Sequence, residues 1–378
     1  MKFIDLDRQY DRIKADMDSR IQSVIDKKDF IMGSAVSELE ERLANKVGRK
    51  YCLTCASGTD ALVIPLMAYN LSQTDAVFVS SFTFFASAEA VSLAGGTPVF
   101  VDSDNTYNMD PDNLEKAIEK VLDEGKLRPK GVIAVDIFGL SADYHRILPI
   151  AKKYNLFVLE DAAQGFGGSI DGVLNCKHGD VSATSFFPAK PLGCYGDGGA
   201  IFTDDDKLYE LMHSIRVHGQ GSSRYDNVRI GINGRLDTIQ AAVLLAKLTI
   251  FDDEMERKNH IADQYTRRLK DAFVTPLIPS NCYSSYAQYT LQAKGEEERN
   301  HIVAGMKEVD IPVMIYYSVP MHMQTAFNYL GYEPEDLPVC YKFSKKVFSI
   351  PMHAYLPDEE IKQITDRLKQ IVEPCGGV

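Results

Sequence analysis

The chain has 378 residues, a length typical of two domains, with 45% hydrophobic and 25% charged residues. Its formal net charge is −12, and like charges are not clustered, so nucleic acid and anionic membrane surfaces are not expected as partners. No apolar stretch approaches the roughly 18 residues of a membrane span, and the charged N-terminus lacks a signal-peptide core. Seven scattered cysteines indicate reduced thiols, which together with these absences predicts a cytoplasmic protein.

Helical patterns occupy the region before residue 50. Apolar residues recur there at helical spacing, at Ile13, Met17, Ile21, Val24 and Ile25. Ser37 and Glu40 then form a capping-box pattern, which predicts that a second helix begins at Ser37.

Seven short apolar runs follow, separated by helical stretches. They are YCLTC, AVFVS, PVFV, GVIAV, LFVLE, VSATSFF and AIFT, beginning at Tyr51, Ala76, Pro98, Gly131, Leu156, Val181 and Ala200. Most are apolar at every position, as are strands that helices cover on both faces. The pattern predicts an α/β fold with a large domain built on a mainly parallel seven-stranded sheet. Ligands of such sheets bind at the carboxyl ends of the strands.

The pattern becomes mainly helical after Arg235, and we predict a domain boundary within this helical segment. Residues 1–250 would form the large domain and residues 251–378 a smaller α+β domain. The smaller domain would contain strands in AQYTLQA, from Ala287, and in VMIYY, from Val313. It would end in an amphipathic helix carrying Ile361, Ile364, Leu368 and Ile371.

The segment SFFPAKPLGCYGDGGAIFT, from Ser185 to Thr203, holds the strongest candidate for chemistry. Lys190 stands between two prolines, after an apolar run and before a cluster of glycines. Proline fixes φ, glycine permits close approach of the backbone, and neither suits a helix. Lys190 is therefore expected on a defined loop at the end of a strand. The alternative is a solvated surface lysine, which describes most lysines in any protein.

The segment LFVLEDAAQGFGG ends a predicted central strand with Glu160 and Asp161, and Gln164 lies on the turn that follows. A buried carboxylate is unfavourable unless a cation or hydrogen bonds compensate it. A protonated pyridine nitrogen is such a cation, and pyridoxal phosphate chemistry requires an acidic partner for it. We interpret Asp161 as that partner. The alternative, a carboxylate that caps the next helix, fits Glu160 better.

The segment CASGTDAL, from Cys55, predicts a strand, a turn and the start of a helix. Ser57, Gly58 and Thr59 would offer backbone N–H groups and hydroxyls to an anion there. Cys52 and Cys55 are three residues apart on a strand, so they should point to opposite faces and serve packing. The histidines and cysteines have no zinc-type spacing, and no metal site is expected.

The segment FTFFAS, from Phe82, follows the second apolar run. Its aromatic residues Phe82, Phe84 and Phe85 lie beside a strand end. We expect one ring to stack on a flat cofactor and the other two to pack in the core.

Together these segments resemble the DegT/DnrJ/StrS family of sugar aminotransferases, pyridoxal phosphate enzymes with the fold type I of aspartate aminotransferase. The motifs occur in family order over nearly the whole chain: FIDL, ASGTDAL, EDAAQ, SFFPAKPLG with GDGGAIFT, RVHGQ and NGRLDTIQAA. The match is closest to members acting on UDP-linked 2-acetamido-3-oxo-hexuronic acids, on the route to 2,3-diamino sugars of O-antigens and other surface polysaccharides. Members acting on 4-keto-6-deoxy sugar nucleotides are nearly as similar.

The resemblance implies an aminotransferase that uses pyridoxal 5′-phosphate to move an amino group from L-glutamate to a keto-sugar nucleotide. Lys190 would carry the cofactor as a Schiff base and move the proton, and Asp161 would pair with the pyridinium nitrogen. The other implied cofactor contacts are Gln164 at the ring hydroxyl, Phe84 stacked on the ring, and Gly58, Thr59, Ser185 and Asn233 at the phosphate. Asn233 would come from the partner subunit of a homodimer with shared active sites. The residues implied near the sugar are Arg229, Tyr317 and His322.

Two other functions compete with this interpretation. A pyridoxamine-dependent sugar dehydratase shares the fold, but its relatives carry histidine in place of the Schiff-base lysine, so Lys190 argues against it. A regulatory or binding protein on the same scaffold would have no need for Lys190, Asp161 and Gln164 together.

Overall fold

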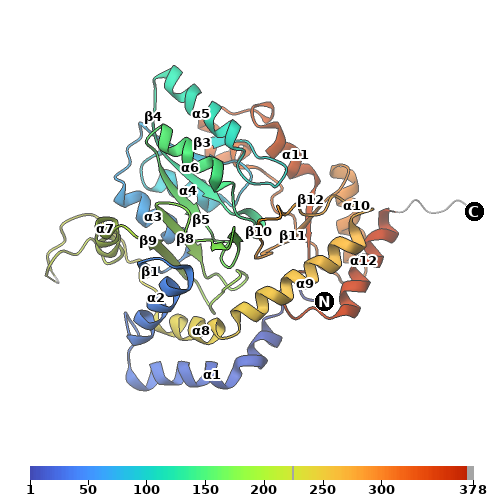
Figure 1. Cartoon of the computed structure of the whole chain (residues 1–378), viewed down its shortest axis with the longest axis horizontal. Coiled ribbons are helices and arrows are strands. Elements are labelled where there is room, and N and C mark those ends of the chain that lie inside the picture. The colour runs from blue at the N-terminus through green and yellow to red at the C-terminus, as the bar shows by residue number, and fades with distance from the viewer. Residues whose placement is uncertain (224, 373–378) are drawn as a thin grey trace, which may run out of the picture.

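The computed structural model describes residues 1–223 and 225–372. A seven-stranded sheet with the order β1-β9-β8-β5-β4-β2-β3 lies at its centre (Figure 1). The strands are β1 (Tyr51–Cys55), β2 (Asp75–Ser80), β3 (Thr97–Val101), β4 (Arg128–Val135), β5 (Phe157–Asp161), β8 (Val181–Ser185) and β9 (Gly199–Thr203). All run parallel except β9, which is antiparallel to β1 and β8. Each predicted apolar run forms one of these strands, which confirms the mainly parallel α/β fold.

Helices cover both faces of the sheet. Successive side chains of a strand point to opposite faces, so neighbouring residues pack against different helices. Val77 and Val79 pack in one core with α3 (Gly58–Ala68), α4 (Phe85–Leu93) and α7 (Asp206–Arg216). Ala76 and Phe78 point to the opposite face, towards α5 (Pro111–Glu124) and α6 (Tyr144–Lys153). Cys52 and Cys55 likewise belong to cores on opposite faces, as predicted.

The N-terminal helices α1 (Leu6–Lys27) and α2 (Ser34–Val47) pack with α8 (Thr238–Leu248) below the β1–β9 end of the sheet (Figure 1). The prediction that the second helix begins at Ser37 is wrong, because Gly33 is the N-cap and the Asp29 carboxylate accepts a hydrogen bond from the backbone N–H of Ser34 (2.8 Å). None of the helices in the described part of the chain combines the length and apolar character that a membrane crossing requires.

The C-terminal part has a core of its own, to the right in Figure 1. Its elements are α9 (Phe251–Leu269), β11 (Tyr289–Gln292), α10 (Glu296–Lys307), α11 (Pro338–Lys346), β12 (Val347–Ile350) and α12 (Asp358–Val372). The run AQYTLQA contains β11, and α12 is the predicted amphipathic helix. The predicted strand in VMIYY is wrong. This segment pairs with β12 only at Met314, and it then turns so that Tyr317 packs against Phe82.

The two parts of the chain are closely connected. The short strand β10 (Cys282–Tyr283) pairs with β6 (Ser169–Ile170), which pairs in turn with β7 (Val173–Leu174). Met321, Phe327 and Phe343 pack in the core of the large sheet. Helix α9 begins at Phe251, next to the predicted boundary, but the division into domains at residue 250 stays a prediction.

Candidate active site

The predicted cofactor residues gather at one edge of the sheet. Parallel strands have their carboxyl ends at the same edge, and four of them lead directly into candidate residues. Strand β1 is followed by Gly58, β2 by Phe84, β5 ends in Asp161, and β8 ends in Ser185. The strand order places β8 next to β5 and separates β5 from β2 by β4 alone.

Lys190 lies on a closed loop that follows β8. The backbone N–H of Cys194 donates to the carbonyl of Phe186, and that of Lys190 donates to Phe187 (both 2.8 Å). Gly193 permits this closure, because a Cβ there would lie 2.5 Å from the carbonyl oxygen of Pro188. Burial lowers the pKa of the Lys190 amine, against the opposing effect of the Asp161 carboxylate. A lowered pKa favours the neutral amine, the form that attacks a carbonyl.

Asp161 is buried, with 3% of its surface exposed, and each of its carboxylate oxygens accepts one hydrogen bond. The Ser87 hydroxyl donates to Oδ2 (2.8 Å) and the backbone N–H of Ala163 to Oδ1 (3.1 Å). Burial raises the pKa of Asp161, although both hydrogen bonds and the charge of Lys190 oppose that shift. A protonated ring nitrogen would supply the positive charge that this buried carboxylate needs.

The start of α3 fits a phosphate group. The N-cap Ser57 accepts a hydrogen bond from the N–H of Asp60 (3.0 Å), whereas the N–H groups of Gly58 and Thr59 have no acceptor among the described residues. Gly58 lets this turn approach β8, because a Cβ there would lie 2.5 Å from the Cβ of Ser185. Free N–H groups at a helix N-terminus beside a serine hydroxyl make an anion site. The residues present therefore fit pyridoxal phosphate at both its ring nitrogen and its phosphate.

Gln164 lies on the turn that follows β5, and its side chain joins two other segments. The Gln164 side chain accepts a hydrogen bond from the backbone N–H of Phe138 (2.7 Å) and donates one to the Tyr317 hydroxyl (3.0 Å). Phe84 is 55% exposed, whereas Phe82 is fully buried. Phe84 is therefore the ring of its segment that is free to stack on a cofactor.

His322 is buried. Its side chain is only 2% exposed, and its Nδ1 lies 2.6 Å from the Ser81 hydroxyl. Its Nε2 is buried and has no hydrogen-bond partner among the described residues. The implied contact of His322 with the sugar stays a prediction.

Arg229 and Asn233 lie on the segment between α7 and α8, and both are exposed. The Arg229 guanidinium donates to the Ser214 hydroxyl, and no carboxylate pairs with it in the described part of the chain. The carbonyl of Gly234 accepts a hydrogen bond from the N–H of Ala56 (3.0 Å), which holds this segment beside the start of α3 in the same chain. The roles implied for Arg229 and Asn233 stay predictions.

Glu160 has a different role from the helix cap that we expected. No helix follows β5 directly, and the Glu160 carboxylate is fully buried. It accepts hydrogen bonds from the N–H groups of Cys176 (2.6 Å) and His178 (2.9 Å) and from the Ser182 hydroxyl (2.7 Å). Glu160 therefore fastens the 176–178 loop to the sheet, and the expectation of a cap is wrong.

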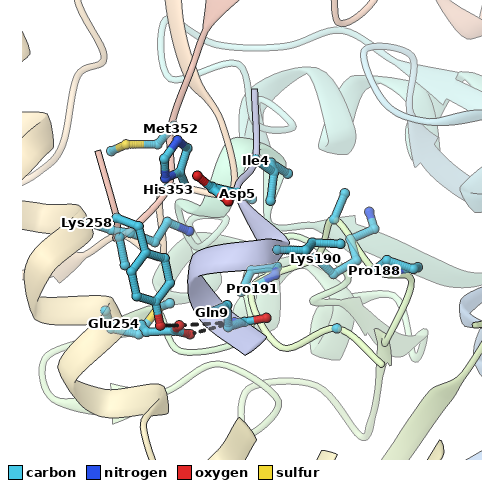
Figure 2. A pocket seen from close by; sticks show the side chains of 17 residues that line it. Ile4, Asp5, Gln9, Pro188, Lys190, Pro191, Glu254, Lys258, Met352 and His353 are labelled. Atoms are coloured by element: carbon cyan, nitrogen blue, oxygen red, sulfur yellow. Dashed lines mark hydrogen bonds between the residues drawn. The ribbon is translucent and has the colours of Figure 1, made fainter. Parts of the chain in front are cut away.

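The sequence did not predict two groups of residues near the site. Ser87, which binds Asp161, lies on α4 after β2, and nothing in its sequence context indicates a partner at the end of β5. The second group lines a cavity of about 50 Å³ beside the Lys190 loop (Figure 2). There Glu254 binds Gln9 and Tyr355. Burial lowers the pKa of Lys258 to about 8 in the same cavity. In residues 1–223 and 225–372, no group of acidic, histidine and cysteine side chains is arranged to hold a metal ion.

Comparison with known proteins identifies the family. Residues 11–369 match the model of the DegT/DnrJ/EryC1/StrS aminotransferase family. The chain belongs to this family. It is 45% identical over 366 residues to the UDP-2-acetamido-2-deoxy-3-oxo-D-glucuronate aminotransferase of Pseudomonas aeruginosa, a match covering 96% of this chain and 98% of the relative.

Solved structures of relatives share the fold. A DegT/DnrJ/EryC1/StrS aminotransferase from Brucella abortus is 46% identical, with a TM-score of 0.96 and coverage of 99% of this chain and all of that one. NtdA from Bacillus subtilis, solved with the bound cofactor PMP, is 26% identical, with a TM-score of 0.90 and coverage of 99% and 85%. The family, the fold, the aminotransferase activity and the pyridoxal phosphate cofactor predicted from the sequence are confirmed.

Proposed function

We propose that this aminotransferase moves the amino group of L-glutamate to a UDP-linked 2-acetamido-3-oxo-hexuronic acid in the cytoplasm, for the synthesis of 2,3-diamino sugars. The catalytic part of the proposal is supported by the position of Lys190, Asp161 and the start of α3 at the same edge of the sheet. The support for the substrate is the 45% identity to an aminotransferase of a UDP-linked 3-oxo-glucuronate.

The chain's own residues divide the work of catalysis. Bound pyridoxal phosphate supplies an electron sink for the charge left when a proton leaves the carbon that bears the amino group. Lys190 would hold the cofactor covalently and, once released, would take that proton and deliver it to the cofactor carbon on the other side of the amino nitrogen. Asp161 keeps the ring nitrogen protonated, and Ser87 orients Asp161. Gly58, Thr59 and Ser185 hold the phosphate, while Phe84 covers the ring and excludes water.

A second copy of the chain would complete the site. Several large apolar side chains near the site-bearing segments are exposed, namely Ile31 (54%), Phe84 (55%), Phe187 (52%) and Ile230 (85%). Large apolar side chains mark a contact surface of a soluble protein where they belong to one patch, and a second copy would cover these four. We propose a homodimer in which Asn233 contacts the cofactor phosphate bound by the other copy.

Hybrid dimers test this arrangement. Lys190→Ala and Asn233→Ala subunits are expected to be impaired as homodimers. If Asn233 acts across the interface, a mixed dimer carries one site with both Lys190 and Asn233 intact, so co-expression restores activity. Activity no higher than the sum of the two homodimers would contradict the shared site.

The substrate assignment is tested with purified protein, glutamate and a panel of keto-sugar nucleotides. We expect 2-oxoglutarate release and an aminated product with the UDP-3-oxo-hexuronic acid, and much slower turnover with a 4-keto-6-deoxy sugar nucleotide. The Lys190→Ala variant is the matched control. Preference for the 6-deoxy substrate would overturn the uronic acid assignment and leave the role of Lys190 untouched.

A further inference from the structure

The orientation of the Gln164 side chain is decided by its neighbours. Its amide oxygen accepts the backbone N–H of Phe138 (2.7 Å), so its NH₂ group must face Tyr317. The amide nitrogen carries two protons. One is donated to the Tyr317 oxygen (3.0 Å), and the other has no acceptor among the described residues.

Tyr317 is left with a free proton by the same contact. Its oxygen accepts from Gln164, and its own O–H has no acceptor in the described part of the chain. Burial raises the pKa of Tyr317, so the phenol keeps its proton at neutral pH. Gln164 and Tyr317 therefore each keep one unused donor, an arrangement that suits an oxygen carrying negative charge.

The neighbours of this donor pair favour one source for that oxygen. The ring of Tyr317 lies 6.3 Å from that of Phe84, the residue proposed to cover the cofactor ring, and 6.1 Å from the buried Phe82. The charge of Asp161, proposed to pair with the ring nitrogen, also acts on Tyr317. Tyr317 is thus in contact with the residues assigned to the cofactor, and its only hydrogen-bond partner among the described residues is one of them.

We propose that Gln164 and Tyr317 together bind the negatively charged ring oxygen of the cofactor, which makes Tyr317 a cofactor-binding residue as well as a neighbour of the sugar. This inference rests on the proposed function. In the cofactor, this oxygen and the carbon that would link to Lys190 are attached to adjacent ring atoms. A donor that stabilises the negative charge of the ring oxygen reduces the attraction of that oxygen for the proton of the Lys190–cofactor linkage. Tyr317 thereby favours the unprotonated linkage near neutral pH.

The test is an absorbance titration of the cofactor-loaded enzyme against pH, without substrate. Tyr317→Phe removes one hydroxyl, and Tyr316→Phe is the matched control, because Tyr316 is the adjacent tyrosine and its hydroxyl makes no hydrogen bond in the described part of the chain. We expect the pKa of the linkage to rise by about one to two units in Tyr317→Phe, the size expected for one hydrogen bond to a charged oxygen. Tyr316→Phe should titrate like the wild type.

A second variant and a kinetic measurement complete the test. Gln164→Met removes the other donor and should raise the pKa of the linkage in the same direction, even if one variant folds poorly. An unchanged titration in Tyr317→Phe overturns the proposal. If that unchanged titration accompanies a raised KM for the keto sugar alone, the donor pair binds a sugar oxygen instead. A wild-type protein without the cofactor band would refute the proposed function itself.

Discussion

Asp161 ends the buried strand β5 and Lys190 lies on the loop that follows β8, whereas Arg229 and Asn233 belong to a segment whose side chains are mostly exposed. Two hydrogen bonds, from the Ser87 hydroxyl and from the backbone N–H of Ala163, hold the Asp161 carboxylate in position. Among the described residues, the Arg229 side chain makes one hydrogen bond, to Ser214. The part of the proposed cofactor site that Lys190 and Asp161 form therefore lies within one chain. The proposed sugar end has groups available for a ligand or for a second copy.

The largest expected effect concerns the region of Lys190 and Asp161. Lys190→Ala should slow the half-reaction with glutamate by more than the 10²–10⁴-fold that is typical for loss of a positioned acid–base, because the covalent linkage is lost as well. The variant should still fold and hold the cofactor without a covalent bond. Release of 2-oxoglutarate in a single turnover measures the effect, and Lys207→Ala, an exposed lysine on α7, is the control. Near-normal rates would remove Lys190 from catalysis.

Asp161→Asn keeps the shape of the Asp161 side chain and removes its negative charge. Each unit of pKa corresponds to about 1.36 kcal/mol, so loss of the buried charge is expected to leave the ring nitrogen unprotonated at neutral pH. We expect the glutamate half-reaction to fall about 10²-fold or more with modest loss of cofactor. The absorbance spectrum and single-turnover rate measure both quantities. A wild-type rate would reduce Asp161 to a structural residue.

Arg229 tests the exposed end. It precedes Asn233 by four residues, which span roughly 13 Å when extended, so it can reach a sugar beyond the ring. A guanidinium binds a carboxylate through two parallel hydrogen bonds, which suits a uronic acid. Arg229→Ala should slow the keto-sugar half-reaction by about 10- to 100-fold and spare the glutamate half-reaction. Arg229→Lys should recover only part of the loss.

The two half-reactions separate the possible roles of Arg229. Equal impairment of both would indicate that it supports the 217–234 segment through Ser214. No impairment of either would leave it as a surface residue.

What the sequence predicts well here is local. Runs such as AVFVS and GVIAV are apolar at each position, and burial on both faces demands that pattern, so the strands and their carboxyl ends are predictable. The Lys190 loop is predictable because proline and glycine restrict its backbone. The misses involve distant partners. Glu160 binds the 176–178 loop, and VMIYY turns so that Tyr317 reaches Phe82 and Gln164. Ser87 on α4 binds Asp161 at the end of β5. No local sequence pattern indicates these contacts.

The smallest expected effect concerns the support of the Lys190 loop. Lys258 is 7% exposed and lies in the cavity beside that loop (Figure 2). Burial lowers its pKa from 10.5 to about 8, against the opposing charge of Glu254. A lowered pKa means that folding disfavours the charged amine. Below pH 8 the charged Lys258 amine therefore lowers the free energy of unfolding by its full amount. This loss shrinks as the pH rises from about 8 towards 10.5.

Lys258→Met keeps the apolar stem and removes the charge, so it should raise the free energy of unfolding by about 1–3 kcal/mol at pH 7. The gain should shrink as the pH approaches the ordinary pKa of lysine. Glu254 keeps its bonds to Gln9 and Tyr355 in the variant, so no carboxylate loses its last partner. Denaturant unfolding at several pH values measures the difference, with Lys270→Met, an exposed lysine at the end of α9, as the control. A variant that is less stable than the wild type at pH 7 would mean that the Lys258 charge is needed to hold the cavity together. The buried end of the site would then depend on an ion pair with Glu254 as well as on apolar packing.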